Sequence, residues 1–213
     1  MSEDGVKITE REELHRGFFR LERYRLRHRL YRGGWSAEIE REIFERGRTV
    51  GILLYDPERD EIVLVEQFRL AAHLTGMPAW ELEVVAGIVD KEGESEIELA
   101  RRESREEAGL ELIGEPIFIH RFMPSTGACT EVIDLFAGRV DASKASGIHG
   151  LADENEDIKV VVLRFEEAMR QVRADAIKNG PTLLALYWLA AERARLRREW
   201  AAAPTDSARL RPG

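Results

Sequence analysis

The 213-residue chain contains a single cysteine, Cys129, and has no run approaching the roughly 18–20 apolar residues that a membrane-spanning helix needs. One cysteine excludes an internal disulfide and is typical of a reducing compartment. The N-terminal sequence MSEDGVKITE lacks an apolar signal segment, which argues against secretion. We therefore expect a cytoplasmic protein that has no membrane partner.

The chain also lacks an excess of basic residues. It has 32 Lys and Arg against 40 Asp and Glu, which gives a formal net charge of −8. A surface of this sign repels nucleic acid, so we expect no nucleic-acid partner. The hydrophobic content of 44% is sufficient for a core, and the length suits one domain, or one domain with an appendage. If such a protein acts on a phosphate compound, it needs local arginines and a cation to offset the repulsion.

The most informative segment is residues 87–110, which read GIVDKEGESEIELARRESREEAGL. Ser95 and Glu98 have the spacing of a capping box, which predicts that a helix begins there. Gly109 stands where the C-terminal cap of that helix belongs. The segment therefore predicts a turn at Gly87, followed by a helix that ends at Gly109.

Acidic side chains gather on one face of this predicted helix. Glu103 and Glu107 are four residues apart and share a face, and Glu106 lies three residues after Glu103. Like charges at this spacing destabilise a helix by about 0.2–0.5 kcal/mol per pair. The face is therefore either a solvated edge or a binding site for a cation. Carboxylate oxygens are the ligands that Mg2+ prefers.

The order of the residues favours the cation, because the segment resembles the Nudix box, G-x5-E-x7-R-E-U-x-E-E-x-G-U with U aliphatic. The matching positions are Gly87, Glu94, Arg102, Glu103, Glu106, Glu107, Gly109 and Leu110. There are two departures from the pattern. Six residues rather than five separate Gly87 from Glu94, which shifts the turn, and Ser104 replaces the usual aliphatic residue, which loosens packing under the helix. Neither departure removes a ligand.

Apolar runs elsewhere in the chain predict a sheet and further helices. The strands are expected at residues 49–55, 61–70, 80–89, 116–122, 131–140 and 157–165, and the helices at 165–174 and 181–200. A turn over residues 56–60 separates the first two strands. The layout, together with the box, predicts an α+β fold, the Nudix α/β/α sandwich with a mixed sheet between helices.

The N-terminal segment 16–46 has a different composition. It is rich in arginine and aromatic residues, and Gly33-Gly34 signals a turn between two extended stretches. Taken alone it is a solvated hairpin. A two-stranded hairpin has marginal stability by itself, so we expect it to lie against a second subunit. We divide the chain into a β appendage for dimerisation and adenosine binding (1–47), a hydrolase domain (48–200) and a flexible tail (201–213).

A second group of candidate functional residues lies in the acidic segment GIHGLADENED at residues 147–157. Its two glycines and four acids indicate a loop before a strand. Taken alone, this is a flexible acidic loop. Beside a Nudix box it offers a carboxylate that can remove a proton from an attacking water, which the box helix itself does not obviously supply.

Segments spread over residues 16–200 also resemble the bacterial ADP-ribose pyrophosphatases. They are RGFF (16–19), RHRL (27–30), REIFERG (41–47), VVAG (84–87) and SGIHGLADENEDI (146–158). The resemblance implies a homodimer whose N-terminal β pieces exchange and help to form an adenosine pocket. It also implies Mg2+-dependent hydrolysis of ADP-ribose to AMP and ribose 5-phosphate, with Mn2+ as a substitute metal.

Matching the positions carries residue roles over to this sequence. The Ala86 carbonyl with Glu103, Glu107 and Glu156 corresponds to the metal site, and Glu154 to the catalytic base. The residues implied in substrate binding are Phe18, Arg41, Glu42, Arg46, Arg69, Ile88 and Glu131, of which Arg41 and Arg46 come from the partner subunit. The residues implied in support are Gly87, Glu94, Arg102, Glu106 and Gly109.

Other interpretations of these residues stay open at this point. Phe18 is alternatively a core aromatic of the hairpin, and each arginine is alternatively a solvated or structural group. The segment RFMPSTGACT before Glu131 departs from the glycine-rich version of the family. Two other functions are a pyrophosphatase for another nucleotide sugar, such as GDP-mannose, and a non-catalytic Nudix-fold binding module. Such modules usually lose the box glutamates, which are all present here.

Overall fold

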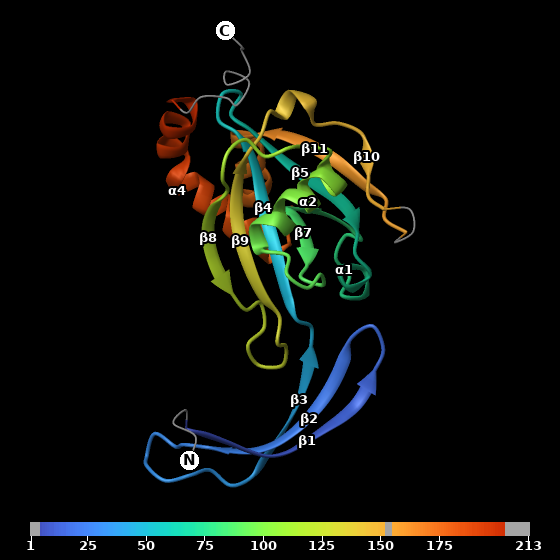
Figure 1. Ribbon diagram of the computed structural model, residues 1–213, viewed down its shortest axis with the longest axis vertical. Helices are drawn as coiled ribbons and strands as arrows, with labels where there is room; N and C mark the ends of the chain where they lie inside the picture. The colour runs from blue at the N-terminus through green and yellow to red at the C-terminus, as the bar shows by residue number, and fades with distance from the viewer. Residues whose placement is uncertain (1–4, 152–154, 203–213) are drawn as a thin grey trace. The chain divides into compact units, whose positions relative to one another are not determined.

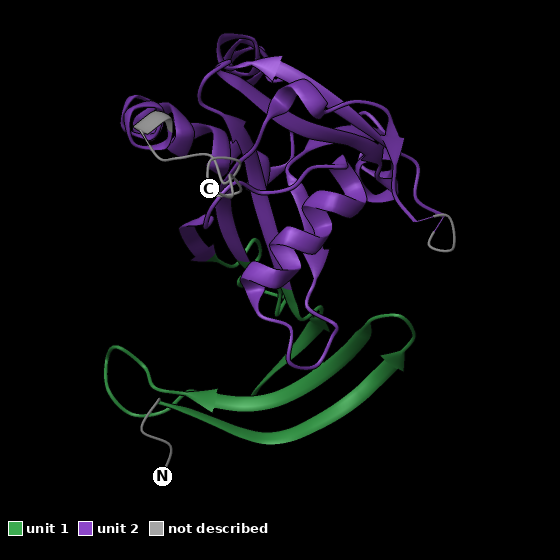
Figure 2. Ribbon diagram, turned by 45° about the horizontal axis from the view of Figure 1, so that its top comes forward, with its two compact units in different colours: residues 1–48, 122–133 green, residues 49–121, 134–213 purple. Residues whose placement is uncertain are grey.

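The computed structural model describes residues 5–151 and 155–202. The chain forms two compact units, which Figure 2 shows in green and purple. Unit 1 comprises residues 1–48 and 122–133, and unit 2 comprises residues 49–121 and 134–213.

The larger sheet contains eight strands. They are β4 (Arg48–Asp56), β5 (Glu61–Phe68), β6 (Trp80–Glu83), β7 (Val85–Ile88), β8 (Ile117–Phe122), β9 (Val132–Arg139), β10 (Ile148–His149) and β11 (Ile158–Arg164). The main order is β10-β11-β5-β4-β9-β8, while β6 pairs with β5 and β7 pairs with β4. Neighbours β11 and β5, and β5 and β4, run antiparallel.

Helices accompany this sheet. They are α1 (Leu70–Leu74), α2 (Glu96–Ala108), α3 (Phe165–Arg173) and α4 (Gly180–Ala202), with a short 3-10 turn at Ala142–Lys144. Figure 1 shows α2 in front of the sheet and α4 behind it. No helix in residues 5–151 and 155–202 is long and apolar enough to cross a membrane.

The alternation of side chains in β4 explains why helices lie on both faces. Val50 and Ile52 point into the same core as Leu99 of α2. Tyr55, on the opposite face, is fully buried and its ring lies 6.3 Å from that of Trp200 in α4. Because successive strand residues point to opposite faces, a strand buried throughout needs apolar cover on each side.

The positions of most elements in unit 2 were predicted correctly, but the short helix α1 and the two-residue strand β10 were not predicted, and one predicted strand is divided. The predicted strand 80–89 is two strands, β6 and β7, because the chain changes its hydrogen-bonding partner from β5 to β4. At the change the Val84 N–H leaves the sheet and donates to Thr182 Oγ1 at 2.9 Å. The partner that receives the Val84 N–H is distant in the chain, so the local sequence pattern does not reveal the break.

Unit 1 is built on a three-stranded sheet rather than the predicted two-stranded hairpin. The order is β1-β2-β3, with strands at Val6–Arg16, Arg20–His28 and Ile39–Glu45. The sequence prediction missed β1, because nearly all its residues are exposed and no apolar face marks it. Gly33 and Gly34 do lie in the connection between β2 and β3, at residues 29–38.

Residues 122–133 join this unit through β3. The Phe44 N–H donates to the Ala128 carbonyl at 2.7 Å, and the Thr130 N–H donates to the Phe44 carbonyl at 3.0 Å. The only buried side chain among residues 5–48 is Glu22, which receives two hydrogen bonds from Arg11. This part of the sheet therefore has no buried apolar core within the chain.

The predicted tail, 201–213, falls almost wholly outside the described residues. Helix α4 ends at Ala202, two residues beyond the end predicted from the sequence.

Candidate functional site

The acidic helix α2 begins and ends where its local chemistry predicts. The Ser95 side chain accepts from the Glu98 N–H, and the Glu98 side chain accepts from the Ser95 N–H, so the capping box is confirmed. Gly109 is the C-cap, with φ 65°. A Cβ at Gly109 would lie 2.6 Å from Cε1 of His149, so both the left-handed backbone and the close approach require glycine.

One side of α2 places Glu107 against strand β7. The Glu107 side chain is only 4% exposed, and its Oε2 accepts a hydrogen bond from the Ala86 N–H at 3.2 Å. Burial raises the pKa of Glu107 to about 8, and the charges of Glu103 and Glu156 act in the same direction. Glu107 is therefore a buried carboxyl group that, among the described residues, has no arginine or lysine hydrogen-bonded to it.

Glu103 lies one turn earlier, directly over Gly87. A Cβ built on Gly87 would lie 2.2 Å from Oε1 of Glu103, so any larger residue would displace this carboxylate. Burial also raises the pKa of Glu103, to about 7, with opposition from the charge of Arg102 and support from that of Glu106. The glycine that opens the Nudix box thus makes room for the acid that follows sixteen positions later.

Arg102 organises the carboxylates on the exposed side of the helix. It donates from Nε to Glu94 at 2.9 Å and from Nη1 to Glu106 at 2.8 Å. Its Nη1 also lies 2.9 Å from Oε1 of Glu103. Hydrogen bonds between charged groups fix orientation as well as contributing energy. Arg102 therefore joins Glu94 and Glu106, and the supporting role of these three residues stays a prediction.

Glu156 approaches this helix from the acidic loop. Its Oε2 accepts from the Leu151 N–H at 3.1 Å, and the Gly150 N–H donates to the Glu106 carbonyl at 3.2 Å. These contacts hold the described part of the loop against α2. Glu154, the predicted catalytic base, lies outside the described residues.

These carboxylates fit a hard cation by their chemistry. Among residues 5–151 and 155–202, no three His, Cys, Asp or Glu side chains converge closely enough to hold a metal ion as they stand. The charges of Glu103 and Glu156 are nevertheless near enough to raise the pKa of Glu107, and the charge of Glu156 also raises that of Glu103. Oxygen donors of this type suit Mg2+ or Mn2+. A bound cation would relieve the burial of two like charges.

Arg69 lies beside the same carboxylates. It follows β5 and donates from Nη2 to Oε2 of Glu83 at 2.6 Å and from Nε to Oε1 at 3.0 Å. Glu83 is buried in β6 and was not singled out from the sequence. The signal that could have found it is a pair of acids, Glu81 and Glu83, at alternate positions of a short strand, both on one face.

Several predicted substrate residues cluster within unit 1. Phe18 is 87% exposed, so it is not a core aromatic, and its ring packs edge-on to that of Phe19 at 4.6 Å. Arg46 lies over the Phe19 ring at 4.6 Å, and its Nε lies 3.5 Å from Oε1 of Glu131. The structure therefore brings Phe18, Arg46 and Glu131 into one neighbourhood through Phe19.

The remaining predicted substrate residues have other surroundings. Arg41 is exposed on β3 and donates from Nη1 to the Glu40 carbonyl at 2.7 Å. Glu42, on the same strand, accepts from Arg23 at 3.3 Å. Ile88 is half-buried at the end of β7 in unit 2, where it pairs with Thr49.

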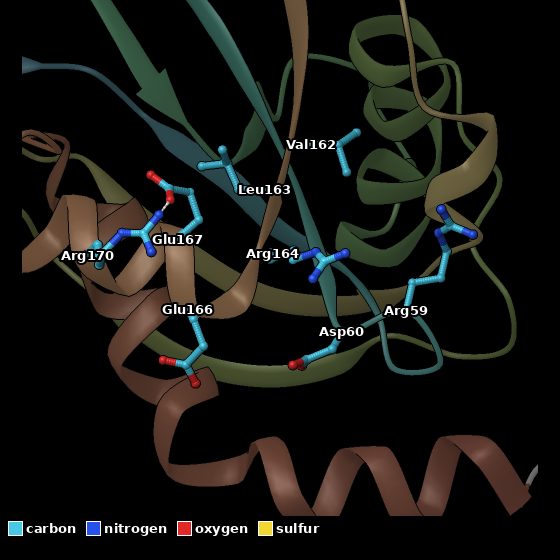
Figure 3. Close-up of a pocket in the computed structure, with 8 residues that line it drawn as sticks. All are labelled: Arg59, Asp60, Val162, Leu163, Arg164, Glu166, Glu167 and Arg170. Carbon is cyan, nitrogen blue, oxygen red and sulfur yellow. Dashed lines mark ion pairs between the residues drawn. The ribbon is translucent and has the colours of Figure 1, made fainter.

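A pocket of about 670 Å3 lies elsewhere in unit 2, where β11 meets α3 (Figure 3). Its lining residues are Arg59, Asp60, Val162, Leu163, Arg164, Glu166, Glu167 and Arg170. Glu167 and Arg170 form an ion pair, shown as a dashed line in Figure 3. None of the predicted site residues lines this pocket.

Comparison with known proteins agrees with the arrangement around α2. Residues 45–186 match the NUDIX domain family. The ADP-ribose pyrophosphatase of Escherichia coli strain K12 is 49% identical over 196 residues, covering 92% of this chain and 93% of the relative. That of Haemophilus influenzae is 39% identical over 202 residues, covering 93% and 92%.

More distant matches agree on the fold. The GDP-mannose pyrophosphatase of Escherichia coli O1:K1 / APEC is 34% identical over 151 residues, covering 70% of this chain and 77% of the relative. A solved structure described as an ADP compounds hydrolase superimposes with a TM-score of 0.68 at 20% identity, covering 93% of this chain and 98% of that one. The predicted sandwich fold is thus confirmed, and the chain belongs to the Nudix family.

Proposed function

We propose that the protein is a Nudix hydrolase that cleaves ADP-ribose with water to give AMP and ribose 5-phosphate. The observation that carries the proposal is a pair of carboxylates, the buried Glu107 and the largely buried Glu103, held against Ala86 and Gly87 at the start of the box. The choice of substrate is supported by relatives named ADP-ribose pyrophosphatase, which match nearly the whole chain at 49% identity. The relative named for GDP-mannose matches less of it, at 34% identity.

The proposed metal ligands are Glu103, Glu107, Glu156 and the Ala86 carbonyl. When bound there, Mg2+ neutralises charge on the diphosphate and lowers the pKa of the attacking water. Arg102 orients the carboxylates from the outer side through Glu94 and Glu106. Glu154 accepts the proton of the water, and the water oxygen forms a new bond to phosphorus as the bridging P–O bond breaks.

Further residues hold the substrate in this proposal. Phe18 offers an exposed ring for stacking on adenine, and Glu131 binds near the terminal ribose. Arg69 and Ile88 act from the same chain as the box. Glu42 also binds the substrate, and Arg41 and Arg46 act from the partner subunit, so the active protein is a homodimer in the cytoplasm. The absence of an apolar core among residues 5–48 supports a second subunit that covers this sheet.

A kinetic screen over ADP-ribose, GDP-mannose, diadenosine polyphosphates and 8-oxo-dGTP tests the substrate. We expect the highest kcat/KM for ADP-ribose, with AMP and ribose 5-phosphate as products identified by chromatography. Preference for GDP-mannose would establish the alternative nucleotide-sugar activity. No turnover of any compound with Mg2+ or Mn2+ would favour a binding module.

The first prediction concerns Glu107. Glu107→Gln should fold normally and lower turnover by several orders of magnitude, because a buried carboxylate ligand is lost from a hard-cation site. Steady-state kinetics at saturating Mg2+ measure the loss. Glu111→Gln, which changes an exposed acid just beyond the same helix, is the matched control. A Glu107→Gln enzyme within about threefold of the parent would contradict the metal site.

The second prediction concerns pH in the presence of EDTA. The pKa of Glu107 is raised to about 8 and that of Glu103 to about 7, from an ordinary value of 4.5. Between 4.5 and about 8 the folded protein therefore binds more protons than the unfolded chain, so the stability that these groups contribute at low pH is lost as pH rises. Above pH 8 no further loss is expected from them.

Urea unfolding at several pH values measures this contribution. The parent in EDTA should lose more stability between pH 5 and 8 than the Glu103→Gln/Glu107→Gln double variant, and Mg2+ should reduce the loss in the parent alone. If the free energy of unfolding changed equally with pH in the two proteins, the raised pKa values of Glu103 and Glu107 would be refuted.

The third prediction separates the two loop acids. Glu154→Gln should lower kcat by about 10²–10⁴-fold with little change in KM, since it removes a general base. Glu156→Gln should instead raise the Mg2+ concentration needed for half-maximal rate. Rate measurements across Mg2+ concentrations distinguish the variants. If excess Mg2+ rescues Glu154→Gln but not Glu156→Gln, the two roles are reversed.

The fourth prediction concerns the dimer. Sedimentation should give twice the chain mass. Arg41→Ala and Glu107→Gln should each be inactive, whereas subunit exchange between them should restore activity, because one site of each mixed dimer is intact. Heterodimers recovered with two affinity tags provide the test. Mixed dimers that form but remain inactive would show that Arg41 does not act across the interface.

A further inference from the structure

Arg69 is hydrogen-bonded to the carboxylate of Glu83, which is not a proposed ligand of the metal ion. Three contacts join its Nε and Nη2 to the two oxygens of Glu83, at 2.6 to 3.1 Å. Glu83 is 5% exposed and fixed within β6, where it pairs with Val65 of β5. The Arg69 side chain is much less covered, with 44% of it exposed. The buried partner therefore fixes the orientation of a partly open arginine.

The geometry leaves one side of the arginine available. The contacts to Glu83 use Nε and Nη2, so the Nη1 group remains free of acceptors among the described residues. A planar guanidinium that is gripped on one edge can still present its other donors to a phosphate oxygen. An arginine with a free Nη1 group can still bind an anion, whereas an arginine whose donors are all paired within the protein cannot.

The side-chain hydrogen bonds and ion pair of Arg69 among the described residues are all made with Glu83, although the charges of Glu107 and Glu156 also act on the arginine. Burial lowers the pKa of Arg69, but the bonds to Glu83 and the charges of Glu83, Glu107 and Glu156 outweigh that effect and raise it. Glu107 and Glu156 thus attract the guanidinium. If Arg69 closed onto either of them, it would occupy a carboxylate that the cation needs.

We propose that Glu83 is a positioning residue that holds Arg69 away from Glu107 and Glu156, keeping the arginine open for a phosphate and the carboxylates open for the cation. This inference rests on the proposed function, because it assigns both partners to the diphosphate site. It makes Glu83 necessary for metal binding although Glu83 touches no metal.

The strand offers a matched control. Glu81 lies two residues earlier in β6, on the same face, and is also 5% exposed. It pairs in register with Gln67 and makes no ion pair with Arg69. Glu81→Gln therefore removes an equally buried negative charge from the same strand without releasing the arginine.

Calorimetric titration with Mg2+ in the absence of substrate gives the decisive readout. Glu83→Gln should weaken Mg2+ binding by roughly 10- to 100-fold, whereas Glu81→Gln should leave it near the parent value. Adding Arg69→Ala to Glu83→Gln should restore much of the Mg2+ affinity, because the competing guanidinium is gone. A merely structural role for Glu83 would not be reversed by deleting a second side chain.

Kinetics with ADP-ribose supply the second readout. Glu83→Gln and Arg69→Ala should each raise KM by roughly 10- to 100-fold, as expected for a lost charged hydrogen bond. In the Arg69→Ala background, Glu83→Gln should add little to KM. Glu83→Asp, which keeps the charge on a shorter arm, should lie between the parent and Glu83→Gln, and serves if Glu83→Gln does not fold.

The outcomes separate this inference from the function on which it rests. A parent that binds Mg2+ but does not hydrolyse ADP-ribose refutes the proposed function, while the titrations still test Glu83. If Glu83→Gln binds Mg2+ as Glu81→Gln does, or if Arg69→Ala fails to restore binding, the inference is wrong even in an active enzyme.

Discussion

The constraint on which the site depends is the burial of two like-charged side chains next to each other. Glu103 and Glu107 lie one turn apart on α2, and removal from water raises the pKa of both. A protein keeps such an arrangement at a cost to its stability unless a cation neutralises it. The apolar contacts of Leu99 and Ala108, and the glycine at position 87, hold α2 against β7 so that the pair remains together.

The arginines of the site are each restrained by acids that are not proposed to bind the metal. Arg102 is hydrogen-bonded to Glu94 and Glu106 and also contacts Glu103, while Arg69 is hydrogen-bonded to Glu83. Positive charge therefore surrounds the buried pair without fully neutralising it. In an acidic protein that acts on a diphosphate, this division provides attraction for the substrate and still leaves carboxylate oxygens for the cation.

The first and last residues of α2 could be predicted because they depend on interactions between residues close in the sequence. The capping box at Ser95 and the glycine at 109 involve groups a few residues apart, so the sequence carries them directly. Strand β1 was missed because its exposed side chains form no apolar pattern. The break at Val84 was missed because it depends on Thr182, which is distant in the chain. Glu83 escaped notice for a similar reason, since its function depends on a partner brought near by the pairing of β5 and β6.

The central claim is that Glu103 and Glu107 hold a divalent cation for hydrolysis of a diphosphate. Crystals grown with Mn2+ and a non-hydrolysable analogue of ADP-ribose test it most directly, through the anomalous scattering of manganese. The account predicts a peak within about 2.0–2.6 Å of oxygens from Glu103 and Glu107, the range for hard cations in proteins, with Glu103 released from Arg102. A peak bound by other residues, with the Arg102–Glu103 contact intact, would contradict it.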